Sequence, residues 1–203
     1  MGKKVERIDT DAFTEYMIME MRHALDYYDY IQRHYEKNDA EFQRVFTEFY
    51  GLNGNGQMSK NKDIYFKKLQ EVKKDDDLIK IVDDFYENMK RTSDGSRDYQ
   101  FSFSTKLLHT KNPDMPIYDS RIKEYLNAVE LERGNKLVDI AGNIENAKKD
   151  WRILTEWSKE SVKPDSKWQT VIQWFNETFP EYAHISDVKK IDTTIYVWVK
   201  STT

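Results

Sequence analysis

The chain has 203 residues, of which 38% are hydrophobic, 14% aromatic and 33% charged, and its formal net charge at pH 7 is -4. This length suits a single domain that covers residues 1–203, and large aromatic rings fill a core with few residues. An acidic chain has no overall positive field that attracts nucleic acid or an anionic membrane. Any contact with DNA must therefore come from a local patch of positive charge.

The sequence contains no cysteine, which excludes disulfides, thiolate zinc sites and cysteine nucleophiles. The first residues lack the apolar stretch of a signal peptide, and no uncharged run approaches the roughly 20 residues of a membrane-spanning helix. His23, His34 and His184 show no metal-ligand spacing. We therefore expect a cytoplasmic protein with no membrane partner, no metal and no cofactor.

Apolar residues spaced by three and four predict helices along the first half of the chain. These helices cover residues 13–35, 42–49, 64–72 and 78–89. Capping residues stand at 9–11, before the first helix, and three aspartates at 75–77 precede the fourth. Gly51 ends the second helix, and the glycines and asparagines of 51–59 predict a loop. Residues 92–98 predict a turn around Gly95.

The same spacing continues in the second half and predicts helices over residues 122–129, 140–154, 168–179 and 185–198. Gly134 ends the first of these helices and Pro164 ends the second. Ser166 and Gln169 form a capping box for the third helix. Residues 193–199 alone have the β-branched and aromatic composition of a strand, but the longer apolar period favours a helix. The predicted fold class is all-α, a multi-helix bundle.

The pattern of residues 99–126 predicts a helix, a short connection and a second helix. Pro113 and Pro116 do not fit a helix interior, so the chain turns there. Asp119 occupies the N-cap position of the second helix. Lys106 lies inside the first helix among phenylalanine and leucine residues, and an apolar surround makes a lysine nucleophilic by lowering its pKa.

The Thr105–Lys106 pair, the proline after it and Asp119 at the start of the next helix resemble the helix-hairpin-helix DNA glycosylase superfamily, particularly its 8-oxoguanine branch. The segment is also similar to uncharacterised bacterial proteins that carry an SFATKLLH…NP…PIYDS signature. The resemblance implies a helix-hairpin-helix unit at about 99–131, DNA as the partner, and excision or recognition of a modified base. It implies that Lys106 attacks the sugar C1′ and forms a Schiff base, and that Asp119 supports the oxocarbenium charge and the deprotonation of the lysine.

Other side chains of the segment are candidates for contact with nucleic acid: Ser102, Ser104, His109, Lys111, Tyr118 and Arg121. The two serines and a helix N-terminus could hold a phosphate. The alternative for His109 is a hydrogen bond to a carbonyl of the connection. The alternatives for Tyr118 and Arg121 are packing of the ring and exposure of the guanidinium to solvent. Residues 99–123 carry four cations and two acids, which would support weak, salt-sensitive binding to DNA.

Two departures from the glycosylase pattern leave other functions open. Residues 101–105 contain no glycine, where these glycosylases have a glycine-rich hairpin, and the spacing from Lys106 to Asp119 is shorter than in the 8-oxoguanine branch. The missing glycines favour a non-catalytic member of the same fold, used as a nucleic-acid or protein interaction module, or a helical scaffold with no nucleic-acid role. In those cases Lys106 is an exposed lysine and Asp119 is a structural cap.

Overall fold

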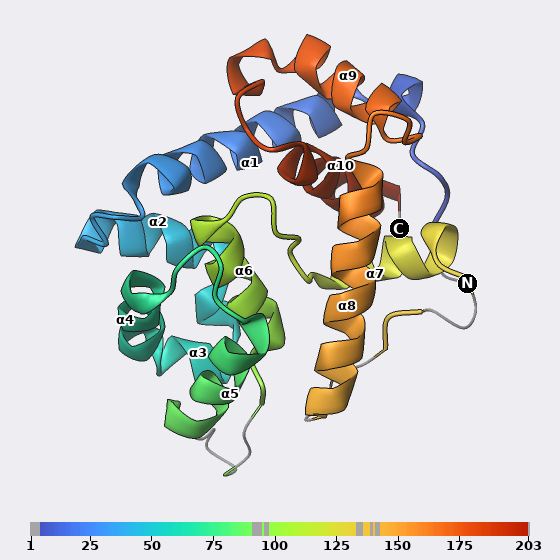
Figure 1. Cartoon of the computed structure of the whole chain (residues 1–203). Helices are drawn as coiled ribbons and strands as arrows, with labels where there is room; N and C mark the ends of the chain where they lie inside the picture. Colours follow the sequence, from blue (N-terminus) through green and yellow to red (C-terminus); the bar gives the residue numbers. More distant parts are fainter. Residues whose placement is uncertain are drawn as a thin grey trace.

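A computed structural model describes residues 5–90, 95, 98–132, 136–138, 140 and 143–202. These residues are all-α, as expected from the sequence, and form no strand. The α-helices are α1 (Glu15–His34), α2 (Ala40–Tyr50), α3 (Gly56–Ser59), α4 (Lys62–Glu71), α5 (Leu78–Asn88), α6 (Phe101–Lys111), α7 (Ser120–Tyr125), α8 (Ile144–Ser161), α9 (Gln169–Thr178) and α10 (Asp187–Thr202) (Figure 1). Within the described ranges, no helix has the length and apolar character needed to cross a membrane.

Side chains of the sequence itself define where the helices begin and end. The oxygen atoms of Thr14, Asp77 and Asp119 accept hydrogen bonds from first-turn N–H groups of α1, α5 and α7, groups that a helix start otherwise leaves unpaired. Gly51 ends α2 with φ +69, and its N–H group donates to the carbonyls of Thr47 and Glu48. The predicted N-cap at Asp119, a cap within the predicted run 75–77 and the predicted end at Gly51 are confirmed. The caps expected at 9–11 for the first helix are wrong, because Thr14 caps α1 and Asp9 caps a separate 3-10 turn.

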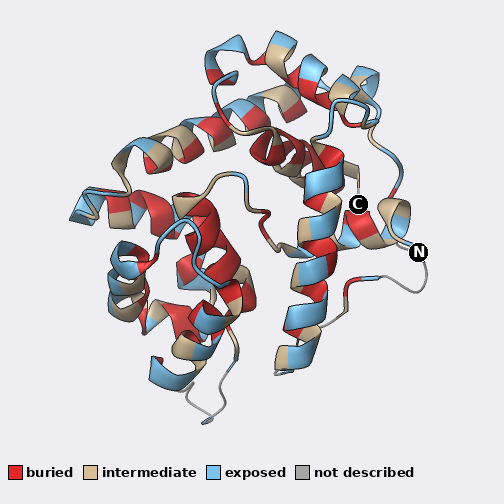
Figure 2. Cartoon of the chain, viewed as in Figure 1, coloured by how far each residue is buried: buried red, intermediate tan, exposed pale blue. Residues whose placement is uncertain are grey.

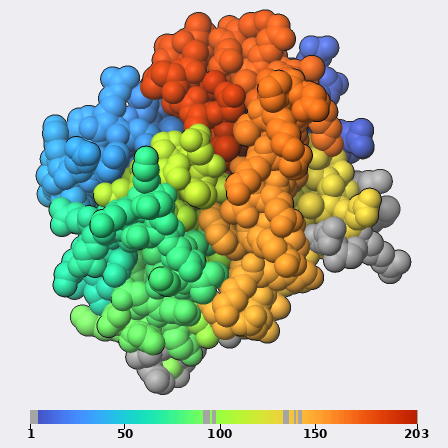
Figure 3. Space-filling model, viewed as in Figure 1, coloured from blue at the N-terminus to red at the C-terminus, as the bar shows by residue number. Residues whose placement is uncertain are grey.

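The buried apolar side chains form two clusters. The first, the α2–α6 core, is built by helices α2 to α6, and the second, the α7–α10 core, by helices α7 to α10 with most of the buried face of α1. Helix α8 contributes Ala147 to the α2–α6 core and Leu154 to the other core, and it runs along both (Figures 1 and 3). The buried faces of the helices turn toward each other where the cores meet (Figure 2).

Several predicted boundaries are wrong in detail. The loop expected at 51–59 contains a 3-10 turn (Leu52–Gly54) and the short helix α3, because the Asn55 side chain accepts from the N–H groups of Gln57 and Met58. Helix α1 begins at Glu15 after a separate 3-10 turn (Thr10–Ala12), and α8 begins at Ile144 rather than at 140.

The capping box expected at Ser166 and Gln169 does not form. The Gln169 amide donates to the carbonyls of Val162 and Lys163 at the end of α8, so it bridges two helices instead of closing its own. The C-terminal segment is helical, as favoured by its longer apolar period. The predicted stop at Gly134 lies outside the described residues, as does most of the turn at 92–98.

A buried histidine joins α1 to α6. His109 Nδ1 donates to the carbonyl oxygen of Met115 at 2.5 Å, and the Tyr28 hydroxyl donates to His109 Nε2 at 2.9 Å. A carbonyl only accepts, so Nδ1 carries the proton and Nε2 is the acceptor. Burial, aided by the charge of Lys189, lowers the pKa of His109 to about 3. The alternative interpretation of His109, a hydrogen bond to a carbonyl of the connection, is confirmed.

This histidine makes the stability of the fold dependent on pH. The unfolded chain protonates His109 near pH 6.5, whereas the folded protein does so only near 3. The unfolded state therefore binds more protons between these values, and the free energy of unfolding falls with decreasing pH by up to about 1.4 kcal/mol per pH unit. Urea unfolding between about pH 6.5 and 5 will show this fall in the wild type and a flatter dependence in His109→Gln. His23→Gln, at an exposed position, will keep the wild-type slope, and equal slopes in all three proteins would contradict the assignment.

Candidate active site

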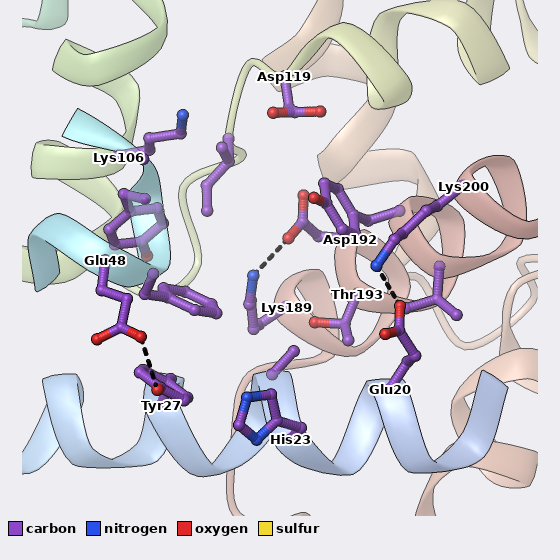
Figure 4. Close-up of a pocket in the computed structure, with 17 residues that line it drawn as sticks. Glu20, His23, Tyr27, Glu48, Lys106, Asp119, Lys189, Asp192, Thr193 and Lys200 are labelled. Atoms are coloured by element: carbon purple, nitrogen blue, oxygen red, sulfur yellow. Dashed lines mark hydrogen bonds and ion pairs between the residues drawn. The ribbon is translucent and has the colours of Figure 1, made fainter. Parts of the chain in front are cut away.

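A cavity of about 390 Å³ opens where the two cores meet. Its walls come from α1, α2, α6, α10 and residues 117–119 of the connection between α6 and α7. Lys106 and Asp119 lie at one end of the cavity in Figure 4, and residues of α1 lie at the other, with Lys189 and Asp192 between them. Segments that are distant in the sequence therefore form the walls of this one cavity.

Lys106 is held in the cavity wall by a helix that is buried on almost every side. Nine of the eleven residues of α6 are buried, and Lys106 itself is 8% exposed. Its Nζ lies over the Phe103 ring at 4.7 Å and the Tyr50 ring at 5.8 Å from the centroids. No described residue forms a hydrogen bond or an ion pair with this amine.

The surroundings of Lys106 favour the neutral amine. Burial lowers the pKa of Lys106, and the positive charge of Lys189 acts in the same direction. The carboxylates of Asp119 and Asp192 oppose this effect without cancelling it. A buried lysine with a lowered pKa is the form in which this side chain acts as a nucleophile.

Hydrogen bonds that join Ser102 and Thr105 of α6 to the residue before Asp119 hold this aspartate at the cavity. The Ser102 hydroxyl donates to the Tyr118 carbonyl at 2.8 Å, and the Tyr118 N–H donates to Thr105 Oγ1 at 3.0 Å. Thr105 in turn donates to the Ser102 carbonyl at 2.8 Å. The residue before Asp119 is thus fixed to the same helix that carries Lys106. We call these contacts the Ser102–Thr105 latch.

Three polar pairs line the rest of the cavity. Lys189 Nζ lies 2.6 Å from Asp192 Oδ2, Lys200 pairs with Glu20, and the Tyr27 hydroxyl donates to Glu48 at 3.2 Å (Figure 4). Asp119 accepts from the Arg121 N–H at 2.9 Å, the hydrogen bond of the α7 N-cap, and forms no ion pair with the described residues. Lys106 and Asp119 therefore remain as an amine and a carboxylate available to a ligand.

Tyr50 presents a further polar group beside Lys106. Its hydroxyl is buried and has no hydrogen-bond partner among the described residues. Thr110 is near, but its hydroxyl donates to the Lys106 carbonyl at 2.8 Å. Burial, followed by the charge of Asp192, raises the pKa of Tyr50, so this phenol is neutral, and its hydroxyl lies beneath the cavity surface that the residue lines.

The side chains expected to bind nucleic acid do not gather around this cavity. Ser104 and His109 are completely buried, and the Ser104 hydroxyl donates to the Gln100 carbonyl within α6. The Ser102 hydroxyl is used by the latch. The start of α6 at Gln100 is itself buried, because the helix enters the α2–α6 core there. Neither serine offers its hydroxyl to a phosphate in this arrangement.

The remaining candidates are partly exposed and lie in different places. The Lys111 ammonium is over the Tyr35 ring, 4.8 Å from its centroid, and the Tyr118 hydroxyl donates to the Val138 carbonyl at 3.1 Å. Arg121 lies 4.5 Å from the centroid of Tyr196, a residue of the cavity wall. Of these three, Arg121 contacts the wall residue Tyr196, and Tyr118 stands between the wall residues Ile117 and Asp119.

The sequence reasoning missed the residues of α10 and α2 that complete the site, above all Lys189, Asp192 and Tyr50. A signal was present for the first two: a lysine and an aspartate at i and i+3 within the segment 185–198, whose apolar residues recur with a helical period. Which cavity they line depends on long-range packing. Within the described ranges, no cluster of three or more His, Cys, Asp or Glu side chains is placed to hold a metal ion.

Comparison of the chain with models of known families, with curated proteins and with solved structures finds no match.

The latch makes a specific contribution to stability. Thr105→Val leaves the buried Tyr118 N–H without its acceptor, and we expect a loss of about 1–3 kcal/mol in the free energy of unfolding. Thr178→Val is the matched control, because that hydroxyl only donates to a carbonyl of its own helix, that of Trp174, a bond of little net value. Urea unfolding measures both variants, and equal losses would contradict the latch.

Two buried tyrosines give a test of the unpartnered hydroxyl. Tyr65 donates to the Phe103 carbonyl at 3.0 Å, whereas Tyr50 has no partner in the described structure. Tyr65→Phe is expected to lower the free energy of unfolding by about 0.5–1.5 kcal/mol. Tyr50→Phe is expected to leave it unchanged or to raise it, because a buried hydroxyl without a hydrogen bond is unfavourable. Thermal unfolding checks both, and a loss in Tyr50→Phe as large as in Tyr65→Phe would contradict the assignment.

Proposed function

We propose that this protein is a DNA-processing enzyme of the helix-hairpin-helix glycosylase kind, which admits one nucleotide with a modified or missing base into the cavity. The observation that carries the proposal is the position of Lys106: a buried amine without an ion pair, on the same cavity as Asp119. These are the two residues that the resemblance assigns to nucleophile and carboxylate. The connection between α6 and α7 is then the equivalent of the hairpin.

The reaction follows from these two groups. The neutral Lys106 Nζ attacks the sugar C1′, the bond from C1′ to the base breaks, and the base departs with its electron pair. Asp119 stabilises the positive charge on the sugar and takes the proton that the amine loses. The sugar ring opens as its oxygen accepts a proton, which leaves an imine between Lys106 and C1′. On an abasic sugar the amine adds to the aldehyde and water is expelled.

The size and walls of the cavity support a nucleotide as ligand. Its volume of about 390 Å³ falls within the range of about 300–1,000 Å³ typical of small-molecule sites. A base turned out of the duplex needs aromatic or apolar walls and hydrogen bonds to its edge. Tyr27, Phe49 and Tyr196 supply rings.

A second candidate keeps the same imine chemistry but applies it to a small carbonyl compound. The carboxylates of Glu20 and Glu48 line the cavity, and negative groups there disfavour phosphates. The overall charge of -4 acts in the same direction. Lys106 would then bind an aldehyde or ketone that enters without a DNA backbone.

Borohydride trapping tests the proposal, because it converts an imine into a stable covalent link. Duplex DNA with an abasic site or a modified base is expected to give a covalent complex with the wild type and none with Lys106→Met. Asp119→Asn keeps the N-cap, for which asparagine and aspartate are equally suited, and is expected to slow trapping by about 10²-fold or more. Lys80→Gln, on the exposed face of α5, is the control and traps like the wild type.

The outcomes separate the candidates. A complex that persists in Lys106→Met would contradict the assigned nucleophile. Absence of a complex with every DNA substrate, together with trapping of a small aldehyde at Lys106, would favour the second candidate. Absence of both would exclude imine chemistry and leave an interaction module or a scaffold.

A further inference from the structure

Helix α10 places a buried ion pair in the wall of the cavity. The side chains of Lys189 and Asp192 are 7% and 13% exposed, and their charged atoms lie 2.6 Å apart. The Lys189 ammonium also lies 5.0 Å from the Tyr28 ring centroid and 5.7 Å from that of Phe49. The ammonium of Lys189 therefore contacts two rings and one carboxylate, and Figure 4 shows its contact with Asp192.

The charged and titratable groups that line the cavity with Lys106 come from every wall. They are Glu20, His23 and Tyr27 of α1, Glu48 and Tyr50 of α2, Asp119, and Lys189, Asp192, Tyr196 and Lys200 of α10. Three of the four carboxylates have a cationic partner: Glu20 pairs with Lys200, Glu48 with Arg44 and Asp192 with Lys189. Asp119 is held by the N-cap hydrogen bond of α7. These pairings leave Lys106 as the lysine of the cavity wall that has no counterion in the described structure.

We propose that Lys189 is a positioning residue that occupies Asp192 in an ion pair and thereby leaves the Lys106 amine without a counterion and able to attack a carbonyl. A buried carboxylate without a partner is strongly unfavourable, so it attracts the nearest available cation. Lys106 is the other buried lysine on the wall of this cavity. Without Lys189, Asp192 would pair with Lys106 and hold it in the charged form.

The charges around Lys106 act on its pKa in the direction that the proposal requires. Asp192 raises the pKa of Lys106 and Lys189 lowers it, while burial remains the largest effect. Removing Lys189 deletes the cation that opposes Asp192 and frees that carboxylate to approach the amine. Removing Asp192 as well deletes the attraction and returns Lys106 to an environment dominated by burial.

The inference rests on the lysine chemistry of the proposed function but not on its DNA substrate, so the probe is formaldehyde with cyanoborohydride. This reagent forms an imine with a neutral amine and reduces it to a methylamine. Peptide mass spectrometry measures the methylation rate of Lys106 across a pH series, with exposed Lys80 in the same digest as the internal reference. Failure of DNA trapping would leave this experiment unaffected.

Lys189→Met is expected to slow methylation of Lys106 about tenfold near neutral pH and to shift its pH profile to higher pH by about one unit, the equivalent of that factor. Lys189→Met combined with Asp192→Asn is expected to restore the wild-type rate and profile. Asp192→Asn alone, which retains a side chain of the same shape, is expected to react at least as fast as the wild type, with its profile at lower pH.

A purely structural role of Lys189 would give a different pattern. If the double variant were as slow as Lys189→Met, or if Lys189→Met reacted like the wild type with an unshifted profile, the proposal would be overturned. If Lys189→Met does not fold, Asp192→Asn alone tests the proposal. An unchanged pH profile of Lys106 methylation in that variant would contradict the influence of Asp192 on Lys106. Circular dichroism establishes that each variant is folded before the rates are compared.

Discussion

The proposed chemistry of this protein depends on the burial of one amine, that of Lys106, without a counterion. A charged group in a low-dielectric interior is unfavourable unless an opposite charge and hydrogen bonds compensate it. For Lys106 the described structure supplies two ring faces, which attract a cation weakly. The surroundings therefore favour the neutral, nucleophilic form of the amine, and the arrangement of neighbouring charges preserves it.

Three features of the fold place the Lys106 amine and the Asp119 carboxylate in this buried site. Helix α6 is buried along nearly its whole length, so it carries Lys106 to the boundary between the two cores. The Ser102–Thr105 latch fixes the backbone next to Asp119 onto the same helix. The His109 ring joins α6 to α1 through Tyr28, and α1 forms the opposite wall of the cavity. The latch adjoins both proposed reacting residues, because Thr105 precedes Lys106 and Tyr118 precedes Asp119.

The sequence allowed the local features to be predicted and left the tertiary ones open. The caps at Asp77 and Asp119 and the end of α2 at Gly51 follow from single side chains and neighbouring backbone groups. The candidate pair Lys106 and Asp119 came from a short motif, and the structure places both residues on one cavity. Their roles in catalysis remain a prediction. Short-range patterns thus identified the amine and the carboxylate without identifying their surroundings.

The features that the sequence did not reveal depend on long-range packing. Ser104 looks like a surface polar residue near a lysine, but α6 is enclosed on almost every side, so this serine is buried and its hydroxyl donates within the helix. Lys189 and Asp192 lie more than 80 positions from Lys106 along the chain. Only the packing of α10 against α1 and α7 brings them to the same cavity.

The most direct test of the central claim is an NMR titration of the lysine side chains, in which the Lys106 signal is assigned by its loss in Lys106→Met. The account predicts that the Lys106 Nζ titrates with a pKa below about 10.4, the value of an unperturbed lysine. A Lys106 pKa at or above that value would mean that the amine has found a counterion, and the site as described would not hold a nucleophile.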